Sequence, residues 1–249
     1  MNLLEQIYEK AKKHPSKVAF PEALNEKMMQ AAYETGKEGY IIPILVGNAE
    51  EIRNAARERG YEEDVFKIVD IQEEAYKKSL IDKYVALPHT VLKEKPLNRR
   101  MQNPLYYAMV MQSVEEADVT FAGIDNTTGD VLLAGQMIIG LKPGISTISS
   151  IGLCDIPGFQ GSEGSLLAVG DSAVCTNPNE QQLADIAVSA CDTVKSLLGW
   201  EPRCAMVSYS TLGSGQGELI DKVVKAVQLA NEQRPDLAID GEFQFDAAI

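Results

Sequence analysis

The chain has 249 residues, of which 45% are hydrophobic and 24% are charged, a composition typical of a soluble globular protein. Its formal net charge of −13 argues against nucleic acid and against an anionic membrane surface as partners. No apolar run approaches the ~20 residues that a membrane-spanning helix needs, and the N-terminal residues show no signal peptide. The length permits one large α/β domain or two smaller ones.

The cysteines and histidines limit the chemistry further. The four cysteines are well separated and form no CxxC pair, so we predict free, buried thiols and a cytoplasmic location: Cys154, Cys175, Cys191 and Cys204. His14 and His89 are the only histidines, too few for a histidine-based metal site. The sequence therefore predicts no metal.

Apolar runs alternate with helical patterns through the first half of the chain. Strands are predicted over 17–21, 41–46 and 65–69, and helices over 25–38, 50–59 and 73–84. Such alternation is typical of a mostly parallel sheet with helices on its faces. Pro43 is an irregularity in the second strand, because proline cannot donate to a sheet ladder.

The segment 86–100 is the least regular part, and its pair Arg99-Arg100 is interpreted as a solvated surface feature. A helix with a methionine-rich face is predicted over 101–116, and that face is expected to be core. A strand over 118–123 then leads into the hydroxyl-rich turn 125–130, and a helical pattern follows over 131–139.

We place a domain boundary near 141–146, which gives a first α/β domain over 1–143 and a second over 144–249. The second is expected to have a strand over 145–153, a glycine-rich hairpin connection over 157–165 and apolar strand residues from 166. A long helix is expected to begin with Asn177 as its N-cap, with Glu180 at the capping-box position, and to end at Gly199. A strand over 204–207, a helix over 218–232 and a strand over 237–239 follow.

The turn Ser208–Gly215 lies between the predicted strand 204–207 and the predicted helix 218–232. A helix N-terminus carries unpaired N–H groups and partial positive charge, and glycines let a backbone approach an anion closely. A strand, a turn rich in hydroxyls and glycines, and a helix is thus a phosphate-binding arrangement. The turn lacks the lysine of a Walker A motif and the GxGxxG spacing, and an ordinary strand-to-helix turn is the alternative.

Several motifs, in order along the chain, resemble those of the phosphate acetyltransferase (phosphotransacetylase) and phosphate butyryltransferase family. They occupy residues 103–107, 127–130, 171–174 with 177–179, 201–215 and 234–248. The resemblance covers essentially the whole chain and is closer to the acetyl-type enzymes than to the butyryl branch.

This resemblance implies a two-domain α/β fold with mostly parallel sheets, flanking helices and an interdomain cleft, related to isocitrate and isopropylmalate dehydrogenases. It implies a phosphate acyltransferase that moves a short acyl group, most simply acetyl, between coenzyme A and inorganic phosphate. Coenzyme A is then a substrate, no cofactor is expected, and the family relationship implies a homodimer.

The residues expected to bind acyl phosphate or coenzyme A lie in the two hydroxyl-rich turns. They are Asn126, Thr127, Thr128, Ser208, Ser210, Thr211, Gly213, Ser214 and Gly215. No catalytic residue is assigned, because the resemblance places the candidate base, with a Ser-Arg pair, beyond Ile249. Relative to the family, the chain is therefore expected to be short at its C-terminus and its second domain incomplete.

The chain also departs from the family pattern at positions where a phosphate-facing cation is expected. Leu133-Ala134 stands where the family has Arg-Pro, and the basic segment before Asn103 is degenerate, with His89 or Arg99 as possible substitutes. These departures keep a second hypothesis open, a non-catalytic or repurposed relative that binds acyl phosphate or acyl-CoA. A nicotinamide-dependent dehydrogenase is a third hypothesis, against which stand the absence of a dinucleotide fingerprint and of a metal-binding carboxylate pattern.

Overall fold

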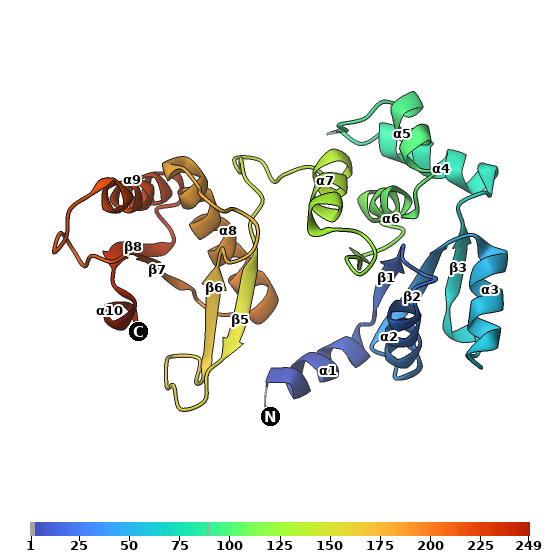
Figure 1. Cartoon of the computed structure of the whole chain (residues 1–249), viewed down its shortest axis with the longest axis horizontal. Helices are drawn as coiled ribbons and strands as arrows, with labels where there is room; N and C mark the ends of the chain where they lie inside the picture. The colour runs from blue at the N-terminus through green and yellow to red at the C-terminus, as the bar shows by residue number, and fades with distance from the viewer. Residues whose placement is uncertain (1–2, 89) are drawn as a thin grey trace. The chain divides into compact units, whose positions relative to one another are not determined.

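The computed structural model describes residues 3–88 and 90–249. The chain divides into two compact units, residues 1–140 and 141–249 (Figure 1). The sequence analysis places this boundary at 143/144. Each unit is described by itself below.

The first unit contains a four-stranded parallel sheet in the order β3-β2-β1-β4. The strands are β1 (Ser16–Phe20), β2 (Ile41–Gly47), β3 (Lys67–Asp70) and β4 (Val119–Thr120). The parallel sheet predicted from the alternating pattern is confirmed. Pro43 is accommodated inside β2 because β3 pairs with β2 only from Ile44 onward, so the proline lies outside that ladder.

Helices cover both faces of this sheet. They are α2 (Glu26–Lys37), α3 (Ala49–Glu58), α4 (Glu74–Val85), α5 (Glu94–Arg100), α6 (Pro104–Ser113) and α7 (Thr128–Ile138), with a short 3₁₀ turn at Glu63–Val65. The exposed helix α1 (Leu3–Lys13) precedes β1. Because side chains alternate along a strand, Ala19 and Ile44 pack with α4–α7, whereas Phe20 and Leu45 pack with α2 and α3. Two apolar cores result, one on each face.

The irregular segment before residue 101 contains a helix that the sequence analysis did not predict. This helix, α5, ends with Met101 as its C-cap, and α6 begins only after Asn103, whose side-chain oxygen accepts a hydrogen bond from the Leu105 N–H at 2.8 Å. The predicted helix 101–116 is therefore shorter, because Asn103-Pro104 starts a new helix. The expected methionine-rich core face is confirmed, since residues 105–111 of α6 are all buried.

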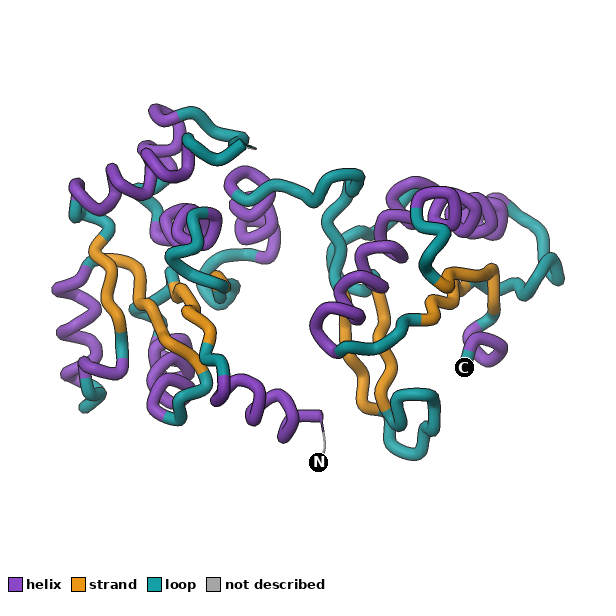
Figure 2. Tube along the Cα trace, turned by 180° about the vertical axis from the view of Figure 1, so that it is seen from behind, coloured by secondary structure: helices purple, strands orange, loops and turns teal. Residues whose placement is uncertain are grey.

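The second unit has two short sheets. Strands β5 (Ile151–Asp155) and β6 (Leu166–Gly170) pair antiparallel, and Figure 2 shows them side by side with the glycine-rich loop at their end. Strands β7 (Arg203–Val207) and β8 (Ala238–Phe243) pair parallel. The predicted strand over 145–153 begins only at Ile151, and the hairpin role of the loop at 157–165 is confirmed.

Two helices, α8 (Glu180–Leu198) and α9 (Glu218–Gln233), pack together against the β7–β8 pair, and a short helix, α10 (Phe245–Ala248), follows β8. The core between them contains Ala187 and Cys191 of α8, Met206 of β7 and Val227 of α9. This packing fixes the position of the loop that joins β7 to α9.

The predicted start of α8 is wrong by two residues. Asn179 is the N-cap: its side chain accepts from the Gln182 N–H at 2.9 Å, and the Gln182 side chain accepts from the Asn179 N–H at 3.0 Å. Asn177 instead accepts a hydrogen bond from the Lys222 ammonium group at 3.2 Å. The capping box formed by Asn179 and Gln182 satisfies two backbone N–H groups at the start of the helix. Asn177 and Glu180 form no such pair of hydrogen bonds here.

All four cysteines are free, but the prediction of uniform burial is wrong. Cys191 is buried, Cys175 and Cys204 are half-buried, and Cys154 is exposed on β5. The error follows from the hairpin, because a strand in a two-stranded sheet leaves much of its surface to solvent. Among the helices of the described residues, none is long and apolar enough to cross a membrane.

Candidate functional site

The turn Ser208–Gly215 folds around a carboxylate of the protein itself. Ser210 is completely buried, and its hydroxyl donates to Glu242 Oε1 at 2.8 Å. The Gly213 N–H donates to the same oxygen, also at 2.8 Å, and the Leu212 N–H donates to the Glu242 backbone carbonyl at 3.0 Å. Glu242 is 3% exposed and belongs to β8, the parallel neighbour of the strand that leads into the turn.

Two further hydroxyls of this turn, those of Ser208 and Ser214, have partners within it, whereas Thr211 Oγ1 accepts from the Gln244 N–H at 2.9 Å. Ser208 Oγ accepts from the Ser210 N–H at 2.9 Å, and Ser214 Oγ accepts from the Thr211 N–H at 2.9 Å. The Gly215 N–H donates to Ser210 Oγ at 2.9 Å. Gly213 has a φ of 84°, in the left-handed region where glycine is favoured, and this lets its N–H point at Glu242. Many polar groups of the turn are thus bonded to other groups of the protein, whereas the Tyr209 side chain is 60% exposed.

The second predicted turn has the same construction in the first unit. Glu22, 5% exposed and two residues beyond β1, accepts from the backbone N–H groups of Gly123, Ile124 and Asn126 at 2.8–3.1 Å. The Asn126 side-chain amide is a fourth donor and lies 2.7 Å from Glu22 Oε1. These donors come from the turn that follows β4, and β4 is the parallel neighbour of β1.

These hydrogen bonds decide the ionisation of both carboxylates. Burial raises the pKa of Glu22, but the N–H donors of Ile124, Asn126 and Gly123 outweigh it and hold the pKa below the ordinary value. The pKa of Glu242 is lowered chiefly by the Gly213 N–H, with the Ser210 hydroxyl contributing. Each turn therefore surrounds a negative charge that belongs to the chain.

Thr127 and Thr128 begin α7. Thr127 is its N-cap, with its hydroxyl and N–H both bonded to Asp130 in a capping box. Thr128 is exposed on the first turn of the helix. Farther along α7, Leu133 is half exposed, whereas Ala134 is completely buried. A long side chain at position 133 would therefore reach solvent.

The predicted ligand-contacting residues thus differ in burial and in hydrogen bonding. Ser210 is buried, while Asn126 and Thr127 spend their polar groups on Glu22 and Asp130. Thr127, Thr128, Gly213 and Ser214 are exposed, and Ser208, Thr211 and Gly215 are half-buried. Of the exposed residues, Gly213 already donates its N–H to Glu242, and Ser214 Oγ already accepts from Thr211. Contact of any of these residues with a ligand stays a prediction.

Neither Glu22 nor Glu242 was predicted as a site residue, although Glu242 lies within the family motif 234–248. The available signal was a glutamate at the end of a parallel strand next to a turn rich in N–H and hydroxyl donors. Such a carboxylate can satisfy several donors at once, as an external anion would. Glu22 and Asn126 are 104 residues apart, so their spacing in the sequence does not predict the hydrogen bond between them.

The two candidate substitutes for the missing cation have different outcomes. His89 lies outside the described residues. Arg99 lies in α5 and lines an open pocket of about 720 Å³. No group of three or more His, Cys, Asp or Glu side chains within residues 3–88 and 90–249 could hold a metal ion.

The whole sequence matches one family. The family model for phosphate acetyl/butaryl transferase matches residues 2–249. The chain belongs to this family. The phosphate acetyltransferase of Thermoanaerobacterium thermosaccharolyticum is 36% identical over 250 residues, which span 100% of this chain and 76% of that protein. The phosphate acetyltransferase of Clostridium acetobutylicum is also 36% identical, over 253 residues that span 100% of this chain and 75% of that protein.

Solved structures agree with the family assignment. The fold is similar to that of EutD phosphotransacetylase from Staphylococcus aureus, with a TM-score of 0.83 and 28% identity over 99% of this chain and 74% of the other. It is also similar to a phosphotransacetylase from Streptococcus pyogenes, with a TM-score of 0.84 and 28% identity over 100% of this chain and 75% of the other. The resemblance inferred from short motifs is therefore confirmed along the chain.

Proposed function

We propose that this protein is a phosphate acyltransferase that moves a short acyl group, with acetyl as the first candidate, between coenzyme A and inorganic phosphate. The observation that carries the proposal is the match of residues 2–249 to the family, with relatives at 36% identity that are phosphate acetyltransferases. We also propose a homodimer, a cytoplasmic location and a reaction without metal or bound cofactor.

In the proposed reaction, the thiol sulfur of coenzyme A attacks the carbonyl carbon of the acyl phosphate. A carbon–sulfur bond forms, the bond from that carbon to the bridging phosphate oxygen breaks, inorganic phosphate leaves, and the thiol proton passes to a base. Hydrogen-bond donors that stabilise charge on the carbonyl and the leaving phosphate accelerate such a step. We assign no residue as the base.

The exposed parts of the two turns are the proposed substrate contacts. Thr128 is exposed at the start of α7. Ser214 is exposed close to the start of α9, and its Oγ also accepts from the Thr211 N–H. Both helix starts carry unpaired N–H groups and partial positive charge, which favour a phosphate. Glu22 and Glu242 then act as positioning residues, because each holds its turn in one conformation. The relationship to isocitrate and isopropylmalate dehydrogenases, with a cleft between the domains, belongs to the same proposal.

The decisive experiment mixes the purified protein with coenzyme A and acetyl, propionyl or butyryl phosphate and follows thioester absorbance. Turnover that is strongest with acetyl phosphate is expected. The loop variant Ser210→Ala with Ser214→Ala is expected to lose most of it, and Ser196→Ala, on the exposed side of α8, serves as the matched serine control. Circular dichroism establishes that each variant is folded.

Absence of thioester formation by the folded protein would refute the enzyme proposal. If that protein still bound coenzyme A or acyl phosphate in calorimetry, the second hypothesis, a relative that binds without catalysis, would replace it. The observation that favours this second hypothesis is Leu133, a half-exposed apolar side chain where the family pattern has a cation.

A further inference from the structure

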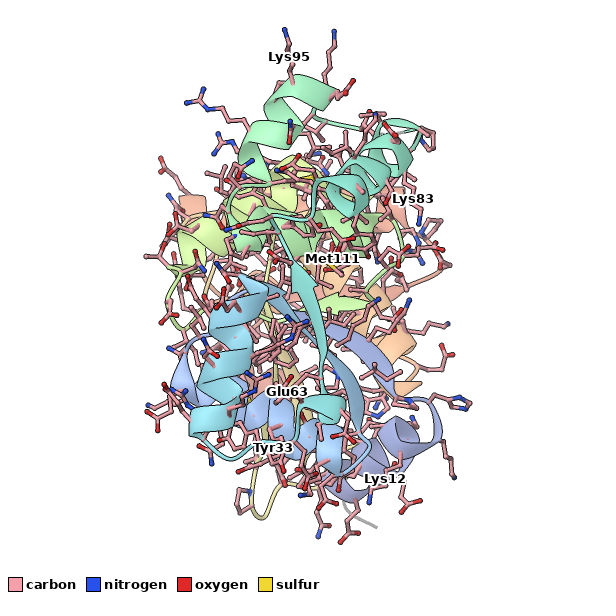
Figure 3. The ribbon with its side chains drawn as sticks, turned by 90° about the vertical axis from the view of Figure 1, so that its right-hand side faces the viewer. Lys12, Tyr33, Glu63, Lys83, Lys95 and Met111 are labelled. Carbon is pink, nitrogen blue, oxygen red and sulfur yellow. The ribbon has the colours of Figure 1, made fainter. Side chains whose placement is uncertain are left out.

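The open pocket on the first unit is lined by three cations. It lies where α5 meets the start of α6, has a volume of about 720 Å³, and is bordered by Lys95, Pro96, Arg99, Arg100, Asn103 and Tyr106. Figure 3 shows Lys95 extending from the end of the α5 ribbon, away from the body of the unit. None of the three cations has a carboxylate within ion-pair distance among the described residues. The pocket is thus a local positive region on a chain with a net charge of −13.

This grouping of charge is unfavourable for α5 by itself. Lys95 and Arg99 are four residues apart on one short helix, so their side chains share a face and repel each other. Lys95 is also the second residue of α5, where the helix dipole disfavours a cation. No carboxylate of the described residues lies within ion-pair distance of either side chain, and a bound anion would reduce the repulsion between them.

The floor of the pocket is ordered. The Arg100 guanidinium lies over the ring of Tyr106 with 5.1 Å to its centroid, and its Nη1 is 3.4 Å from the tyrosine oxygen. Tyr106 is 8% exposed, so this stack fixes Arg100 against a buried ring. Asn103 uses its side-chain oxygen to cap α6, which leaves its NH₂ group as a donor at the pocket. The pocket thus offers one anchored arginine, two cations without an ion pair among the described residues, and an amide donor, and such groups bind phosphate oxygens.

We propose that this pocket binds a ligand with two or more phosphoryl groups and that, in the proposed reaction, this ligand is coenzyme A. The second part rests on the proposed function. Coenzyme A carries a diphosphate and a ribose 3′-phosphate, so it supplies several negative charges to the three cations, whereas acyl phosphate supplies one phosphate. Arginine pairs with phosphate through two parallel hydrogen bonds, and lysine adds a point charge. The pocket therefore contributes affinity for the nucleotide end of coenzyme A and takes no part in acyl transfer.

The test compares charge-removing variants by calorimetry. Arg99→Gln and Lys95→Gln remove exposed cations that form no ion pair with a described residue, so we expect neither to disturb the fold. Lys27→Gln removes one charge from an exposed position on α2 and is the control. We expect each pocket variant to weaken coenzyme A binding about ten-fold and the double variant about a hundred-fold, with less than a two-fold effect of the control. Affinity for acetyl phosphate should not change.

Three further ligands distinguish the source of the phosphate groups. Coenzyme A lacking its 3′-phosphate, ATP and inorganic pyrophosphate are titrated into the same proteins. Removal of the 3′-phosphate and the Arg99→Gln change are each expected to weaken coenzyme A binding. If the two changes together weaken it by less than the sum of their separate effects, the 3′-phosphate is the group held by Arg99. If ATP or pyrophosphate binding depends on the variants while coenzyme A binding does not, coenzyme A is overturned as the ligand and the phosphate site remains. If no ligand responds to the variants, the site itself is overturned.

Failure of this inference and failure of the proposed function give different results. Thioester turnover with an unchanged KM for coenzyme A in Lys95→Gln with Arg99→Gln refutes the pocket and leaves the acyltransferase proposal intact. Variant-dependent binding of coenzyme A without any turnover supports the pocket and refutes the acyltransferase proposal.

Discussion

The hydroxyl of Ser210 donates to the carboxylate of Glu242 at 2.8 Å, although 32 residues separate them. Glu22 makes the equivalent connection in the first unit, where it collects the N–H groups of the turn after β4. In both places, a glutamate at or just beyond the end of one parallel strand holds the turn that follows the neighbouring strand. The hydroxyl- and glycine-rich turns are therefore shaped by an internal anion, and only their exposed residues remain for a substrate.

Ser210→Ala is expected to destabilise the protein by about 1–3 kcal/mol, because the buried Glu242 carboxylate and the Gly215 N–H each lose a hydrogen-bond partner. Chemical denaturation measures the free energy of unfolding. Hydrogen exchange should show faster exchange at the Gly215 amide. Ser196→Ala, on the exposed side of α8, should change stability by less than about 0.5 kcal/mol. Equal effects of the two changes would contradict a structural role for the Ser210–Glu242 contact.

Glu22 is expected to make stability dependent on pH in the acid range. Its native pKa lies below the ordinary 4.5, so the folded state binds its proton less readily than the unfolded state. The resulting stabilisation is fully present above pH 4.5 and is lost as the pH falls through the lower native pKa. The free energy of unfolding, followed from pH 7 downward into the acid range, measures this loss.

The matched variant for this effect is Glu22→Gln. The glutamine NH₂ group is a donor and faces backbone N–H donors, so we expect the free energy of unfolding to fall by about 1–3 kcal/mol at neutral pH. Between neutral and acid pH, the stability of this variant should decline less than that of the unchanged protein. Glu58→Gln, on the exposed end of α3, should behave as the unchanged protein does. A Glu22→Gln protein with the original acid profile would show that another carboxylate is responsible.

Substitution of Asn179 and of Asn177 distinguishes the observed N-cap of α8 from the predicted one. Asn179→Ala removes the acceptor of the Gln182 N–H and should cost about 1 kcal/mol of stability. Asn177→Ala removes only an exposed contact with Lys222 and should cost less than about 0.5 kcal/mol. Thermal unfolding of the two variants measures both values. The reverse order would place the start of α8 where the sequence pattern had put it.

Thiol labelling is expected to distinguish the cysteines by exposure. Cys154 should react quickly with a thiol reagent in the native protein, while Cys191 should react only on unfolding, because it is buried between α8 and β7. Mass spectrometry after a short labelling pulse identifies the modified residue. Cys154→Ser should abolish the rapid phase, and a rapid phase that survives this change would contradict the exposure of Cys154 on β5.

The sequence by itself determined the features that depend on local order along the chain. Alternating strand and helix patterns gave the parallel sheet of the first unit, because apolar periodicity is set by backbone geometry. Glycine at position 199, with a φ of 72°, ends α8 as expected, since few other residues adopt that conformation. The motifs at 201–215 and 234–248 were enough to indicate the family.

Only the tertiary structure decided which polar groups are available for chemistry. Ser210 and Thr128 look equivalent in sequence, yet Ser210 is buried on Glu242 and Thr128 is exposed. Likewise, Arg99 and Arg100 are exposed, as their sequence pattern predicts, but only the packing of α5 beside α6 places them with Lys95 around a pocket. Hydrogen bonds and charge pairs act over a few ångströms between residues distant in sequence, so their partners are fixed when the elements pack and not by spacing along the chain.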